Sequence, residues 1–141
     1  MDEIQILQLS AEQYTGNGMF TVAVIIGIFI TFRAARFAAQ NNIFAKVMTS
    51  LFGLMIGWFS IVVGSLRPVI DAATAVRFAD AQAAGATLTA QAQDAIAQAG
   101  ASAGDVVTQN YFGDIGTVAF TAIFLIIALG IIWGPKMDFS E

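Results

Sequence analysis

The chain contains neither cysteine nor histidine among its 141 residues. It therefore has no thiolate or imidazole with which to hold zinc, copper, an iron–sulfur cluster or haem by itself. A histidine-based catalytic triad and a cysteine nucleophile are excluded on the same ground. We expect no enzyme activity and no metal or cofactor bound by this chain alone, and the lack of cysteine leaves the redox compartment open.

Charged residues are also scarce, with 6 Lys and Arg against 10 Asp and Glu. None of them falls inside residues 13–32, 47–66 or 115–135, which are stretches of 20, 20 and 21 residues. The usual sign of a proton relay or ion pathway, a charge within a membrane span, is thus missing. A basic surface suited to nucleic acid is missing as well, so we expect no nucleic-acid partner.

Each of the three uncharged stretches is long enough for a transmembrane helix. A hydrocarbon core of roughly 30 Å needs about 20 apolar residues at helical rise. The hydrophobic fraction of 57% exceeds that of an ordinary soluble domain. The chain begins Met-Asp-Glu and lacks the basic region of a secretory signal, so we expect the first span to be retained. These features predict an all-α integral membrane protein with three transmembrane helices.

The sequence divides into six predicted segments. They are an outer N-terminal segment (1–12), transmembrane helix 1 with a cytoplasmic extension (13–40), transmembrane helix 2 (43–66), an outer helical hairpin or loop (67–114), transmembrane helix 3 (115–135) and a cytoplasmic tail (136–141). Asn41 and Asn42 are the expected break between the first two helices. Pro68 is expected to close helix 2 or to start the next helix, because proline suits a first helical turn but not an interior.

The distribution of basic residues predicts the orientation. Arg33, Arg36 and Lys46 lie between spans one and two, and Lys136 follows span three. Basic residues near span ends favour the cytoplasmic side, so these four are predicted cytoplasmic anchors. The protein is therefore expected to be N-out and C-in, in a bacterial or archaeal cell membrane.

The alanine-rich segment 67–114 is predicted to form an extramembrane helical hairpin between helices 2 and 3. Alanine and other apolar residues recur at helical spacing over 69–83 and again over 88–99. Gly85 is the expected turn, and Gly100 with Gly104 is expected to end the second short helix. A flexible Ala/Gln/Gly linker is the alternative, because alanine favours helix but buries little surface.

Glycines supply the clearest packing signal. Gly53 and Gly57 form a GxxxG pair in span two, Gly130 and Gly134 form another in span three, and Gly64 extends the first. Small residues four apart allow close backbone approach between membrane helices. We predict that these five positions serve helix packing, either within the chain or with a partner, and a homo-oligomer is possible.

Aromatic residues mark the predicted span ends and one interior position. Tyr14 and Tyr111 fall near the outer ends and Trp133 near the inner end, as expected for interfacial aromatic belts. Trp58 falls near the middle of span two. We predict that it packs against a neighbouring helix. Contact with a lipid or a bound pigment is left open.

These observations together predict a protein that catalyses no reaction by itself. We expect a non-catalytic accessory or structural subunit of a larger membrane complex, such as an oxidoreductase or another energy-converting assembly. Its partners would be other integral membrane subunits and lipids. The alternative is a holin-like, homo-oligomeric pore-forming protein, and a third possibility is a small receptor or lipid-binding protein that uses the outer hairpin.

Overall fold

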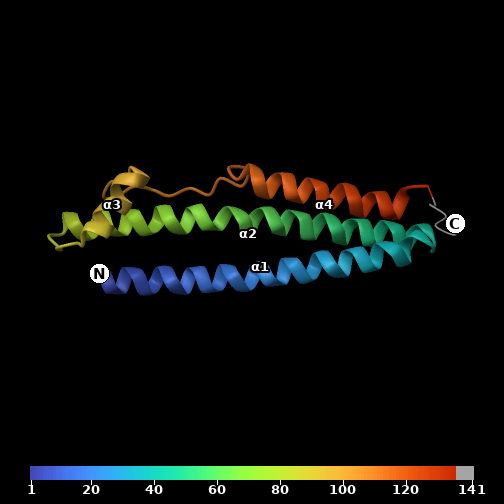
Figure 1. The fold of residues 1–141 in the computed structure, drawn as a ribbon, viewed down its shortest axis with the longest axis horizontal. Helices are drawn as coiled ribbons and strands as arrows, with labels where there is room; N and C mark the ends of the chain where they lie inside the picture. Colours follow the sequence, from blue (N-terminus) through green and yellow to red (C-terminus); the bar gives the residue numbers. More distant parts are fainter. Residues whose placement is uncertain (136–141) are drawn as a thin grey trace. The chain divides into compact units, whose positions relative to one another are not determined.

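The computed structural model describes residues 1–135, which form four helices (Figure 1). They are α1 (Glu3–Ala39), α2 (Ile43–Ala83), α3 (Ala90–Ala99) and α4 (Ile115–Trp133), and residues 1–135 contain no strand. The all-α prediction is confirmed. By length and composition α1, α2 and α4 can each cross a membrane, which confirms the three predicted apolar helices and suggests a membrane location. The predicted tail, residues 136–141, lies outside the described residues.

The chain folds as two units. The first comprises Met1–Phe20 and Ser65–Gly113, and the second comprises Thr21–Gly64 and Asp114–Glu141. The second unit therefore contains most of the uncharged helical stretches, whereas the first contains α3 and most of the acidic residues.

Helix α1 begins ten residues earlier than the predicted transmembrane helix 1. Asp2 and Gln5 form a reciprocal capping box, in which Gln5 N–H donates to Asp2 Oδ1 (2.8 Å) and Asp2 N–H donates to Gln5 Oε1 (3.1 Å). Residues 3–12 are thus the first turns of α1 rather than a separate segment. At the other end the predicted break is confirmed, because α1 stops at Ala39 and Asn42 Oδ1 caps α2 by accepting from Ala45 N–H (3.0 Å).

Helix α2 passes through Pro68 instead of ending before it. The predicted boundary at residue 66 is therefore wrong, since the helix runs on to Ala83. Proline removes one backbone hydrogen bond, but Ile70, Ala75, Phe78 and Ala79 after it are all buried. Burial of this apolar face outweighs the single lost bond. The two predicted short helices are consequently reduced to one, because the first of them is the end of α2.

Glycine turns delimit α3 as the sequence predicted. Gly85 has a φ of 90°, and Ala86 N–H donates to the Ala81 carbonyl (3.0 Å), which closes α2 with a Schellman turn. Thr89 caps the start of α3 by accepting from Ala92 N–H, and Gly100 ends it in the left-handed region with a φ of 61°. An irregular segment over residues 101–113 then leads to Asp114, which caps α4.

A small apolar cluster holds α3 in the first unit. It consists of Ile6 from α1, Phe78 and Ala81 from α2, Leu88, and Ala92 from α3, all buried. Ile6 is completely inaccessible to solvent. The segment after α2 is therefore packed on the unit's own helices rather than extended as a linker.

Candidate functional site

The three predicted packing glycines of α2 lie against side chains of the second unit. A Cβ atom at Gly53 would meet Thr31 Cγ2 of α1 at 3.2 Å, and one at Gly57 would meet Leu125 Cδ1 of α4 at 3.1 Å. From α1, a Cβ at Gly27 would lie 2.7 Å from Ile56 Cδ1 of α2. Small residues therefore let α2 approach α1 and α4 closely, as packing in lipid requires.

The closest approach between two helices is at Gly64, where a Cβ would lie 2.5 Å from Thr117 Cγ2 and 3.0 Å from Thr117 Cβ. Thr117 cannot easily turn away, because its hydroxyl donates to Asp114 Oδ2 (2.6 Å). Asp114 also accepts from Gly116 N–H (3.0 Å). These bonds, the Thr117 hydroxyl foremost, lower the pKa of the Asp114 carboxyl, which caps α4.

The glycines of α4 differ from those of α2. A Cβ at Gly130 would meet no atom within 4 Å among the described residues. Gly134 ends α4, and its N–H donates to the Gly130 carbonyl (2.8 Å). A Cβ at Gly134 would collide with that same carbonyl oxygen. Gly134 thus terminates its own helix, and Gly130 is open.

The exposed face of α4 around Gly130 combines three small residues with two isoleucines. At helical spacing, Gly116, Ala119, Ile123 and Ile126 lie on the same side of α4 as Gly130, and all of them are exposed. The opposite side is buried at Thr121, Phe124, Ala128 and Ile132. We call this exposed side (Gly116, Ala119, Ile123, Ile126 and Gly130) the α4 outward face.

Trp133 and Lys46 meet at one end of the second unit. The indole Nε1–H of Trp133 donates to Ser50 Oγ (2.9 Å), and Lys46 Nζ lies 5.6 Å from the centroid of the Trp133 ring. An indole with its N–H satisfied and a cation over its face is a stable arrangement for a headgroup region. Trp133 and Lys46, which were predicted from the sequence as an interfacial aromatic and a cytoplasmic anchor respectively, are therefore in contact with each other.

The remaining predicted aromatic and basic residues lie at the surface. Tyr14 and Tyr111 are 37% and 40% exposed, and Trp58 is 51% exposed. Trp58 therefore presents half of its ring outward from the second unit. Arg33 and Arg36 are exposed near the end of α1, and Lys136 lies outside the described residues.

Long-range polar contacts in the first unit were not foreseen from the sequence. The Glu3 carboxylate accepts from both the hydroxyl (2.6 Å) and the N–H (2.9 Å) of Thr89. Tyr14 donates its hydroxyl to Asp71, and Arg77 Nη1 donates to Gln13 Oε1 (3.2 Å). Helical spacing alone would suggest local pairs of Asp71 with Arg67 and of Arg77 with Asp80. Helical spacing can suggest such neighbours but cannot reveal partners on another helix.

Neither a search for metal-binding clusters nor comparison with known proteins indicates a function. Within residues 1–135, no three Asp, Glu, His or Cys side chains are grouped so as to hold a metal ion. No protein-family model, curated protein or solved structure matches the chain. The surfaces described above are therefore the basis for assigning a function.

Proposed function

We propose that this protein is a non-catalytic accessory subunit of a larger membrane assembly, in which its helices pack against other integral membrane subunits. The α4 outward face carries this proposal. The glycines of α1 and α2 named above lie against side chains of the same unit, whereas Gly130 faces no atom within 4 Å among the described residues. A membrane-helix glycine that meets no side chain of its own unit leaves room for close approach by a helix from another chain.

The proposed placement in the membrane follows the basic residues. Arg33, Arg36 and Lys46 fall at the same pair of helix ends, where α1 stops and α2 starts. This supports an N-out, C-in orientation, with the connection between α1 and α2 in the cytoplasm of a bacterial or archaeal cell. Residues 67–114, which carry five Asp, would then form an extramembrane hairpin on the outer side.

The first experiment is extraction from the native membrane in mild detergent, followed by native electrophoresis and mass spectrometry. A co-migrating set of larger membrane subunits at fixed stoichiometry is the expected result. Gly130→Leu should reduce that association while leaving insertion intact, because it adds bulk to the α4 outward face without adding charge. Ala122→Leu, at an exposed position of the same helix that is not one of the five residues of that face, is the matched control.

Migration as a homo-oligomer alone would overturn the proposal. In that case the holin-like reading becomes the one to test, by release of a trapped dye from vesicles. A monomer with only lipids attached would contradict both assignments. In that event the receptor or lipid-binding reading would be tested through the ligand that the extract retains.

A further inference from the structure

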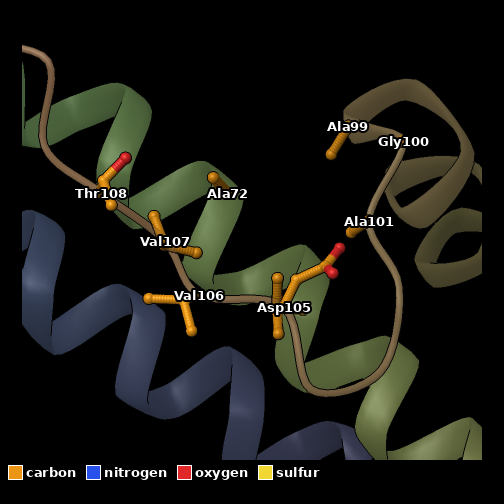
Figure 2. Close-up of a pocket in the computed structure, with 9 residues that line it drawn as sticks. Ala72, Ala99, Gly100, Ala101, Asp105, Val106, Val107 and Thr108 are labelled. Atoms are coloured by element: carbon orange, nitrogen blue, oxygen red, sulfur yellow. The ribbon is translucent and has the colours of Figure 1, made fainter.

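A groove in the first unit is formed by α2, the end of α3 and the irregular segment after it (Figure 2). It has a volume of about 310 Å³. Most of the residues that line it are small, among them Ala72 and Val76 from α2 and Ala99 from α3, and Asp105 and Thr108 add polar groups. The groove is thus large enough to admit a side chain from another protein.

Negative charge is concentrated at one side of this groove. Asp105 lines it, and Figure 2 shows its carboxylate turned toward Ala101. Asp105 Oδ2 accepts from Ser102 N–H (2.7 Å), and Oδ1 accepts no hydrogen bond from the described residues.

The C-terminal end of α3 forms the neighbouring wall. The capping N–H groups of Gly100 and Ala101 go to the carbonyls of Ala97 and Ile96. Among residues 1–135, the carbonyls of Gln98 and Ala99 therefore receive no capping N–H. A helix C-terminus carries partial negative charge on such carbonyls, which favours a cation nearby.

The first unit as a whole carries a net negative charge. Its acidic residues are Asp2, Glu3, Glu12, Asp71, Asp80, Asp94 and Asp105, against the two bases Arg67 and Arg77. Arg77 already donates to Gln13. The unit contains no lysine, because the two lysines of the chain are Lys46 and Lys136. A lysine for the groove therefore has to come from outside the unit.

We propose that this groove docks a lysine side chain from an extramembrane segment of a partner subunit. The inference rests on the accessory-subunit function proposed above. The four-carbon stem lies along Ala72 and Val76, and the ammonium group meets Asp105 Oδ1 near the end of α3. Lysine fits better than arginine, because a planar guanidinium prefers both oxygens of a carboxylate and Oδ2 is already engaged.

The test is zero-length cross-linking of Asp105 in native membranes. A water-soluble carbodiimide activates a carboxylate, and an amine already in contact then forms an amide bond with it. Mass spectrometry should identify an amide between Asp105 and a lysine of a different membrane subunit, the same subunit that co-migrates on native gels. Asp94, an exposed carboxylate on α3 away from the groove, is the matched site and should give no such product.

Two variants separate groove binding from chance proximity. Ala72→Phe fills the groove and should lower the yield of the Asp105 cross-link about tenfold, which corresponds to about 1.4 kcal/mol of lost binding free energy. Asp105→Asn should weaken association about threefold to fivefold, the range for a partly exposed charge pair, whereas Asp94→Asn should not. Because Asp105 is exposed, its variant tests the proposal even if Ala72→Phe does not accumulate.

Each contrary outcome has its own meaning. Co-migrating subunits without any protein cross-link to Asp105 would overturn this inference and leave the accessory function standing. A cross-link to the amine of phosphatidylethanolamine would assign the groove to a lipid headgroup and also overturn it. A chain that purifies without partners, and whose Asp105 couples only to added ethanolamine, would overturn both proposals.

Discussion

The glycines of this chain serve different purposes. Gly64 permits a close approach to Thr117, Gly85 adopts a left-handed turn, and Gly130 faces open space among the described residues. The sequence distinguished the turn, because Gly85 falls between two helical patterns. It could not distinguish Gly57 from Gly130, since both belong to GxxxG pairs, and only the neighbouring helix decides which pair is occupied.

Gly64→Ala should destabilise the second unit. Its Cβ would collide with the Thr117 side chain, which the bond to Asp114 holds in place. Overpacking of this kind costs about 1–3 kcal/mol, against a helix-propensity gain of about 1 kcal/mol for alanine over glycine. Unfolding in a detergent–denaturant titration, followed by circular dichroism, should therefore need less denaturant.

Gly130→Ala is the control for this substitution. It brings the same gain in helix propensity without a collision, so the isolated chain should be unchanged or more stable by up to about 1 kcal/mol. Equal destabilisation by the two variants would show that the contact at Gly64 is not the cause.

At the scale of whole elements, tertiary packing decided what local signals left open. The start of α1 could have been predicted from the sequence, because Asp2 and Gln5 have the spacing of a capping box. The continuation of α2 through Pro68 was not. A proline is a strong local stop, and only the buried residues that follow it in the first unit explain why the helix goes on.

Ile6→Ala should loosen α3 from the first unit. Ile6 is fully buried in the cluster that holds Leu88 and Ala92, so truncation should cost about 2–4 kcal/mol through lost contacts and a cavity. Faster hydrogen exchange of the α3 amides is the expected readout. Ile4→Ala, which truncates a side chain 67% exposed on the same helix, should leave this exchange unchanged.

The contact between Glu3 and Thr89 should depend on pH. Hydrogen bonds from the Thr89 hydroxyl and N–H lower the pKa of Glu3 from its usual 4.5. The contact therefore stabilises the first unit fully above pH 4.5 and loses this effect as the pH falls through the lowered pKa. The amide NMR signal of Thr89 should report this as a titration below pH 4.5.

Glu3→Gln should abolish that titration of the Thr89 amide, and Glu12→Gln, at an exposed site on the same helix, should preserve it. A Thr89 signal that titrates equally in both variants would mean that another group is responsible.

At the scale of the whole molecule, the three apolar helices differ greatly in length. At a rise of about 1.5 Å per residue, α2 is about 60 Å long and α4 about 30 Å. A hydrocarbon core is about 30 Å thick, so α4 matches it and α2 is twice as long as required. Charge-free runs predicted the number of apolar helices correctly. They could not show that α1 begins well before its run or that α2 continues well beyond its run, because the added turns contain charges that a bilayer would reject.

Labelling of single cysteines in intact cells tests the proposed orientation. Cysteines at Gln8 and Ser102, both exposed positions of the first unit, should react with a membrane-impermeant maleimide from outside. One at Asn42, between α1 and α2, should react only after permeabilisation. The nearby Ser10 is not chosen as a labelling site, because its side chain is only 8% exposed. The reverse pattern of labelling would invert the proposed topology.

The two tryptophans of the chain, Trp58 and Trp133, both lie in the second unit, and the two tyrosines, Tyr14 and Tyr111, both lie in the first. The chain thus has two separate intrinsic chromophores. Light that only indole absorbs excites the second unit alone, and brominated acyl chains should quench the emission of Trp58, whose ring is half exposed. Tyrosine absorbance follows the first unit. The unfolding of each unit can therefore be recorded in one unlabelled sample.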